Sequence, residues 1–302
     1  MTILTVRHTT TYRYRRPVGI GDHHMMFRPR DSYDQRLVDS TLVIVPQPES
    51  IRWRHDVFGN AVARATFKGL AEELRFDSTI RVKLYPTSVP DFQTETAATN
   101  YPFAYDAEEL PDLAPSIARR YPDPNSDVER WAMQFLSAGE STPTGKLLMT
   151  MTCAIKDGFS YLRRVERGTQ DPVATLRMRR GTCRDFALLM MEAARSLGLA
   201  ARFVSGYLYM PSRDGKEYLG GGSTHAWCQV YLPGAGWVEF DPTNGIIGNN
   251  DLIRVAVARD PGQAIPLSGS YLGLPDDELG MTVEVNVSSD EPDGSALIQQ
   301  AG

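Results

Sequence analysis

Hydrophobic and polar positions alternate over much of the first 90 residues. Runs rich in β-branched and aromatic residues, separated by Pro, Gly and Asn, predict strands at 4–14, 37–45, 50–56, 60–67 and 73–84. Short strands at this spacing, with turn signals between them, are typical of an antiparallel sandwich. We therefore expect residues 1–100 to form an N-terminal antiparallel, β-sandwich-like domain.

The pattern changes to helical spacing after a proline-rich stretch. Seven prolines between residues 86 and 125 predict a linker at 101–125, with a short acidic helix at 107–120 that is at best interrupted. Beyond it, Asp127 is the expected cap of one helix, and Thr142 with Pro143 opens another. The second helix has an apolar stripe, and a strand at 159–165 and a basic loop follow it. The stripe consists of Leu147, Leu148, Met151 and Ile155.

A third helical pattern begins at Cys183. Thr182 is a good N-cap, Asp185 stands at the capping-box position, and Gly198 supplies the stop. Free N–H groups and the positive end of the helix dipole favour a thiolate at Cys183, in the first turn. Because most cysteines are small buried hydrophobes, position alone does not make Cys183 a nucleophile.

Strand patterns return after this helix. Residues 201–210 are almost continuously apolar, and 225–232 with 237–241 form a predicted hairpin around the turn at 233–236. We place a catalytic core at 126–250, with the glycine-rich loop 212–224 as a candidate lid. Residues 281–288 alternate, so the C-terminal segment 251–289 is expected to return a strand to a sheet. Residues 290–302 have the composition of a disordered acidic tail.

Two residues of the hairpin can complete a catalytic site with Cys183. A nucleophilic cysteine needs a base, and the base needs an orienting acceptor. His225 is the only histidine after Cys183 and begins a strand, while Asp241 ends the next strand, directly before Pro242. An even turn would point the two side chains to opposite faces, whereas an odd turn or a bulge brings them to one face. We predict the odd turn or bulge, with a glycine at the left-handed position.

With these residues and their order, the sequence resembles the bacterial transglutaminase-like cysteine proteases. The specific segments of the resemblance are Gly181-Thr182-Cys183-Arg184-Asp185-Phe186-Ala187, Gly206-Tyr207, His225-Ala226-Trp227 and Gly236-Trp237-Val238-Glu239-Phe240-Asp241-Pro242-Thr243-Asn244. Weaker N-terminal segments match the extra β-domain of that family: Tyr12-Arg13-Tyr14-Arg15-Arg16-Pro17-Val18, Phe27-Arg28-Pro29-Arg30 and Asp56-Val57-Phe58-Gly59-Asn60. The resemblance covers nearly the whole chain.

The resemblance implies a fold, a triad and a reaction. The fold class is α+β, an N-terminal antiparallel β-sandwich-like domain followed by a papain-like, transglutaminase-like α+β core. The triad is Cys183, His225 and Asp241, and the reaction is acyl transfer at amide bonds through a thioester. We expect hydrolysis of peptide or isopeptide bonds. The alternatives are a protein-glutamine amine acyltransferase and a non-catalytic peptide- or protein-binding module on the same fold.

The neighbours of the triad give less specific signals. Arg184 stands where many members have Gln, and Pro261 stands where an aromatic residue is common. We take Arg184, Trp227 and Trp237 as candidate substrate-binding residues, with core packing as the alternative for the two tryptophans. The arginines around Cys183 either favour acidic substrates or form a solvated basic surface that pairs with the acidic tail.

Composition excludes several classes. Of the 302 residues, 42% are hydrophobic and 23% charged, and the net charge of −5 gives no reason to expect nucleic acid as a partner. Three cysteines are an odd number and follow no C-x-x-C spacing, which argues against a disulfide framework and against a zinc ribbon. A zinc site from Cys183, His225 and Cys228 is opposed by strand alternation, which separates the last two. We expect a peptide or protein substrate, no metal or other cofactor, no membrane contact and a cytoplasmic location. The sequence does not predict an oligomeric state.

Overall fold

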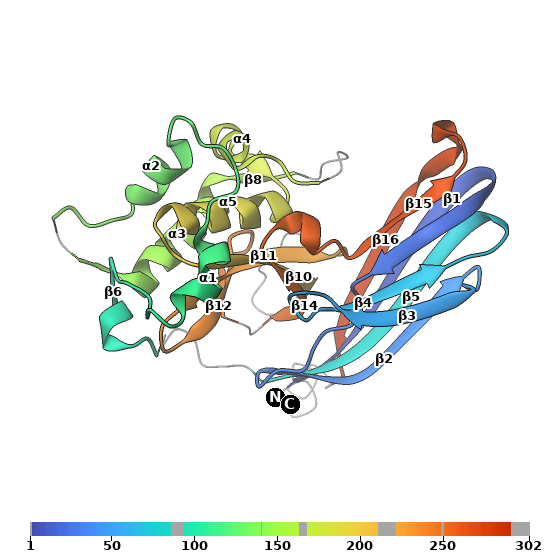
Figure 1. The fold of residues 1–302 in the computed structure, drawn as a ribbon, viewed down its shortest axis with the longest axis horizontal. Coiled ribbons are helices and arrows are strands. Elements are labelled where there is room, and N and C mark those ends of the chain that lie inside the picture. The colour runs from blue at the N-terminus through green and yellow to red at the C-terminus, as the bar shows by residue number, and fades with distance from the viewer. Residues whose placement is uncertain are drawn as a thin grey trace, which may run out of the picture.

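The structure is a computed structural model that describes residues 2–85, 93–139, 141–162, 168–210, 222–248 and 251–290. Figure 1 shows a five-stranded sheet between a group of helices on one side and a second, larger sheet on the other. Predictions for the loop at 212–221, for 163–165 and for the tail beyond Asp290 fall outside these residues.

One long strand organises the larger sheet, which has seven strands in the described part of the chain. The first half of β1 (Thr2–Met25) lies between β5 (Leu70–Leu84) and β16 (Glu278–Ser289), and its second half lies between β4 (Ala61–Thr66) and β15 (Leu267–Leu272). The outer strands are β2 (Gln35–Val45), beside β5, and β3 (Ser50–His55), beside β4. Register shifts in β1 between Arg13 and Val18, and between Ile20 and His23, divide these two halves.

The two halves enclose a common core, which gives the domain its sandwich-like character. Phe76 and Leu74 of β5 share this cluster with Met25 of β1 and with Ala63 and Ala65 of β4. The expected strands are thus confirmed, but β1 continues well past residue 14. Gly21 permits this continuation, because a Cβ there would lie 2.4 Å from the Ser270 hydroxyl oxygen on the neighbouring strand.

The five-stranded sheet carries the residues of interest. Its order is β13-β12-β11-β10-β14, made by the strands Ile246–Ile247, Gly236–Asp241, His225–Leu232, Ala201–Leu208 and Leu252–Ala258. Alternating residues of β11 separate its two faces. Ala226, Cys228 and Val230 pack in the helical core, and Trp227 lies in a different cluster on the other face. The predicted α+β class is confirmed.

Five α-helices occur among the described residues: α1 (Leu110–Ile117), α2 (Asp127–Met133), α3 (Thr144–Gly158), α4 (Pro172–Met178) and α5 (Cys183–Ser196). None of the helices in the described ranges is long and apolar enough to cross a membrane. Two short strand pairs lie in the segments between the helices. One pairs β6 (Asn100–Tyr101) with β7 (Thr142–Pro143), and the other pairs β8 (Ser160–Tyr161) with β9 (Arg180–Gly181). Single 3-10 turns lie at η1 (Thr96–Ala98), η2 (Pro261–Gln263) and η3 (Pro275–Asp277).

Three details of the predicted helices were wrong. The expected basic loop contains α4, whose Asp171 accepts hydrogen bonds from the Val173 and Ala174 N–H groups. Asp127 is the first residue of α2 rather than its cap, because the Asp123 carboxylate accepts the N–H groups at that end. Helix α3 begins at Thr144, one residue after the expected proline, although its predicted apolar stripe is buried.

The strand β14 forms one edge of the five-stranded sheet, and side chains of the N-terminal domain cover this edge. The Gln35 carboxamide exchanges two hydrogen bonds with the Arg254 backbone, at 2.8 and 2.9 Å. The Asn60 carboxamide does the same with the Val257 backbone, at 2.7 and 2.9 Å. These two side chains replace a neighbouring strand, and so satisfy backbone groups that an edge strand leaves open.

Candidate active site

The start of α5 is built around a buried carboxylate. Asp185 Oδ2 accepts hydrogen bonds from the Thr182 N–H at 2.8 Å and from the Thr182 hydroxyl at 2.9 Å, and Oδ1 accepts from the Gln170 N–H at 2.6 Å. The predicted capping box is therefore present. Gly181 has no room for a side chain, since a Cβ there would lie 2.9 Å from the Asp185 Cβ. These contacts fix the backbone that presents Cys183, whose side chain lies in the first turn with the residue only 5% exposed.

The β11–β12 hairpin has the predicted odd turn. Leu232 pairs with Gly236, so three residues form the loop, and Gly234 and Gly236 have φ values of +85° and +73°. In this register Trp237 lies opposite Tyr231 and Glu239 opposite Gln229. Continuing the ladder by two residues places Asp241 diagonal to His225 and on its face of the sheet.

His225 and Asp241 form a buried pair. His225 Nε2 and Asp241 Oδ2 are 2.8 Å apart, and both side chains are fully buried. The carboxylate also accepts from the Thr243 N–H and from the Asn244 side chain, each at 2.9 Å. Burial raises the pKa of Asp241, but the His225 charge and these three hydrogen bonds outweigh it, so the pKa lies below its usual value.

The environment of His225 favours the imidazolium. Burial lowers the pKa of His225, but the charge and hydrogen bond of Asp241, with a further contribution from Cys183, raise it to about 10. Because Nε2 is bound to Asp241, Nδ1 is the nitrogen left to face the thiol, and this buried atom has no hydrogen-bond partner among the described residues. The structure thus brings Cys183, His225 and Asp241 together in one buried cluster.

A second buried carboxylate, Glu239, lies on the same face of the sheet as the His225–Asp241 pair. The Trp227 ring stacks beside the His225 ring, with centroids 6.0 Å apart and planes inclined by 28°. The Trp227 indole N–H donates to Glu239, which also accepts from the Gln229 side chain at 2.6 Å. Gly206 of β10 leaves the space for the indole, because a Cβ there would lie 2.8 Å from Trp227 Cη2. Sequence reasoning missed Glu239, although its position two residues before Asp241 puts both on one face.

The remaining candidates have protein partners. The Arg184 guanidinium donates to the Pro261 carbonyl at 2.7 Å and lies over the Phe203 ring, so it links α5 to η2. Trp227 is wholly buried, which agrees with the packing alternative. Trp237 is partly exposed and borders a pocket between the five-stranded sheet and the N-terminal domain. Of the basic residues near Cys183, Arg177 pairs with Asp127 on α2 at 2.6 Å.

The described residues hold no group of three or more His, Cys, Asp and Glu side chains able to bind a metal ion. Cys228, which the zinc alternative would require, lies in the helical core, and its thiol donates to the Phe240 carbonyl.

Comparisons with known proteins identify both halves of the chain. The model of the bacterial transglutaminase-like N-terminal region matches residues 4–83, and the model of the transglutaminase-like superfamily matches residues 131–242. An uncharacterized protein of Mycobacterium tuberculosis is 30% identical over 295 residues, covering 93% of this chain and 91% of the relative. One from Mycobacterium leprae is 27% identical over 288 residues, covering 93% and 98%.

A solved structure shares the fold. It comes from Cytophaga hutchinsonii, is provisionally described as a cysteine protease, and superimposes with a TM-score of 0.70 over 97% of this chain and 92% of its own. The two sequences are 19% identical, so this likeness concerns the fold alone.

Proposed function

Because the chain belongs to the transglutaminase-like superfamily, we propose that it is a cysteine-dependent enzyme that hydrolyses peptide or isopeptide bonds through a thioester. The observation that carries this proposal is the buried pair of His225 and Asp241 at 2.8 Å, with Cys183 beside it at the start of α5. A buried imidazolium next to a thiol at a helix start is the arrangement that nucleophilic cysteine chemistry requires.

In the first half-reaction the Cys183 sulfur attacks the amide carbonyl carbon, and a C–S bond forms as the carbonyl becomes an oxyanion. The N–H of Cys183 lies in the first turn of α5, where a helix offers no internal acceptor, and is suited to hold that oxyanion. The C–N bond then breaks, and His225 gives its proton to the leaving amine.

In the second half-reaction the neutral His225 takes a proton from water, whose oxygen attacks the thioester. The C–S bond breaks, the acid product leaves and the thiolate–imidazolium pair returns. Asp241 stays ionised throughout and keeps Nε2 protonated, so that Nδ1 faces sulfur in both steps.

Thiol reactivity gives the first test. The chain carries its own controls, because Cys153 is exposed and Cys228 is buried among core residues. We expect iodoacetamide at neutral pH to modify Cys183 faster than Cys153, as measured by peptide mass spectrometry over time. Labelling of Cys183 no faster than that of an unfolded-peptide thiol would instead support the non-catalytic binding module.

Product analysis separates the two enzymatic alternatives. Peptides with internal glutamine and with isopeptide bonds are incubated with the protein, with and without an added primary amine, and analysed by mass spectrometry. Hydrolysis products in the presence of amine support the proposal, and an amine adduct in their place assigns a protein-glutamine amine acyltransferase. Both products must disappear in Cys183→Ala and persist in Cys153→Ala.

A further inference from the structure

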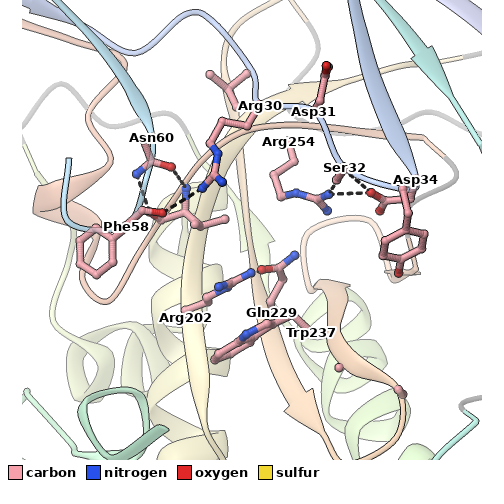
Figure 2. A pocket seen from close by; sticks show the side chains of 15 residues that line it. Arg30, Asp31, Ser32, Asp34, Phe58, Asn60, Arg202, Gln229, Trp237 and Arg254 are labelled. Atoms are coloured by element: carbon pink, nitrogen blue, oxygen red, sulfur yellow. Dashed lines mark hydrogen bonds and ion pairs between the residues drawn. The ribbon is translucent and has the colours of Figure 1, made fainter. Parts of the chain in front are cut away.

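A pocket of about 330 Å³ lies between the N-terminal domain and the five-stranded sheet (Figure 2). Arg202 and Gln229 enter it from the sheet face opposite α5, since their neighbours Phe203 and Cys228 pack in the helical core. The wholly buried Trp227 lies between Gln229 and His225 along β11. The pocket is therefore separate from the cluster around Cys183.

The acidic groups around this pocket are already paired. Arg254 binds Asp34 at 2.8 Å through one terminal nitrogen and Glu239 through the other. The Asp31 carboxylate accepts the Leu37 N–H at 2.6 Å and points away from the pocket in Figure 2. The carboxylates thus have partners other than the two remaining arginines of the pocket.

Those two arginines, Arg202 and Arg30, face the pocket from opposite sides (Figure 2). The Arg202 guanidinium lies 4.0 Å from the centre of the Trp237 ring, and its Nε donates to Gln229 at 2.6 Å. Among the described residues its two terminal nitrogens have no hydrogen-bond or ion-pair partner. In the ranges that the structure describes, Arg30 donates only to the Phe58 carbonyl, at 3.3 Å.

The stack on Trp237 holds Arg202 in a partly desolvated position. Burial lowers the pKa of Arg202 to about 10, and the nearby Arg254 and Arg30 charges act in the same direction, against Glu239. A bound anion would offset this unfavourable environment, because it would be both a counter-ion and an acceptor for the terminal nitrogens.

We propose that this pocket binds a small organic carboxylate, with the carboxylate between Arg202 and Arg30 and an apolar body against Phe58, Trp237 and Val257. A guanidinium presents parallel N–H groups that match the two oxygens of a carboxylate. The apolar walls favour an organic acid over a bare inorganic anion, and the volume is at the lower end for small-molecule sites. The same chemistry is offered by a free acid and by the C-terminal residue of a peptide.

Calorimetric titration of the full chain with phenylacetate tests this site directly, with phenylacetamide as the uncharged control. We expect the acid to bind at least about tenfold more tightly than the amide, since the amide loses charge-assisted hydrogen bonds. Arg202→Met keeps a long unbranched side chain beside Trp237 but removes the guanidinium and its charge. It should weaken phenylacetate binding about ten- to a hundredfold, as should Arg30→Met at the exposed rim.

The matched control is Arg52→Met, an exposed arginine on β3 outside the pocket, which should leave the affinity unchanged. If circular dichroism shows that Arg202→Met folds poorly, the phenylacetate affinity of Arg30→Met still tests the proposal. Cys183→Ala should bind phenylacetate like the parent chain, so this test is independent of the proposed enzymatic function. A capped dipeptide ending in free Phe, compared with phenylacetate, tells which source of carboxylate fits better.

Equal affinities for acid and amide, or unchanged affinity in both pocket variants, would overturn the proposal. Competition by inorganic phosphate at an affinity equal to that of phenylacetate would overturn the assignment to organic acids.

Discussion

Replacing Asp241 with Asn tests the electrostatic basis of the site. The carboxylate accepts three hydrogen bonds, from His225 Nε2, the Thr243 N–H and the Asn244 side chain. An asparagine keeps the size but has one acceptor oxygen and no charge. At least one buried donor therefore loses its partner, and the imidazolium loses its counter-ion.

The magnitude follows from the pKa of His225. Burial alone lowers this pKa, and Asp241 is the largest influence that raises it to about 10. Without the carboxylate we expect the pKa to fall to or below the ordinary 6.5. A fall of that size corresponds to roughly 5 kcal/mol of interaction with the imidazolium, and to a loss of about 3–5 kcal/mol in the free energy of unfolding at pH 7.

The sign of the pH dependence is fixed by both partners. Because the pKa of His225 is raised on folding, its contribution to the free energy of unfolding is complete below pH 6.5 and is lost as the pH rises through about 10. Because the pKa of Asp241 is lowered, its contribution is present above the ordinary 3.8 and is lost on acidification. The variant should therefore differ most from the parent chain between about pH 4 and 6.5, and least in strong alkali.

Two measurements check this. Urea unfolding at pH 5.5, 7 and 10 gives the free energies, and ring NMR signals, assigned with His225→Gln, give the titration. Asp22→Asn is the matched control, since its pair with Arg64 is exposed and should contribute under about 1 kcal/mol. A parent His225 that titrates near 6.5, or an Asp241→Asn chain as stable as the control, would refute the electrostatic reasoning.

Four further outcomes are expected. Asp185→Ala leaves the Thr182 and Gln170 N–H groups without their acceptor and should lower the free energy of unfolding by about 1–3 kcal/mol in urea titrations, whereas exposed Asp39→Ala should not. Gly206→Ala puts a Cβ 2.0 Å from the Ile253 carbonyl oxygen and should cost about 3 kcal/mol or more and disturb Trp227 fluorescence; a normal melting temperature would contradict the packing. Arg254→Met removes the cation that both buried carboxylates, Asp34 and Glu239, contact, and it should lower the free energy of unfolding by about 3–5 kcal/mol at pH 7 in urea titrations. Burial lowers the pKa of His8 to about 4, so unfolding is favoured as the pH falls from 6.5 to 4, and His8→Gln should flatten that part of the stability profile.

Local sequence signals were sufficient for the parts of the site that lie within one helix or one hairpin. Thr182 and Asp185 identify the start of α5 because a capping box needs only four residues. The odd turn could be inferred because strand alternation leaves only two choices of face for Asp241. Helix α4 was missed because its seven residues are too few for a clear period, although Asp171-Pro172 was an available start signal.

The contacts that join distant segments could not be predicted in the same way. Arg254 and Asp34 are 220 residues apart, and Gln35 with Arg254 are 219 apart. Neither alternation nor helical period carries information about such pairs, because both patterns describe only a residue's own element. The pocket of Arg202 and Arg30 therefore emerges only when the two sheets are seen together.

The placement of β1 between β5 and β16 has a consequence for biosynthesis. Strand β1 can pair with β5 soon after both are made, but it acquires its second neighbour, β16, only after the intervening residues up to 278–289 have been made. The strands of the five-stranded sheet all lie between residues 201 and 258, so this sheet can form earlier, while the β16 side of β1 is still unpaired. A fragment that ends near residue 100 would keep that side open permanently, and we expect it to self-associate rather than behave as an independent unit.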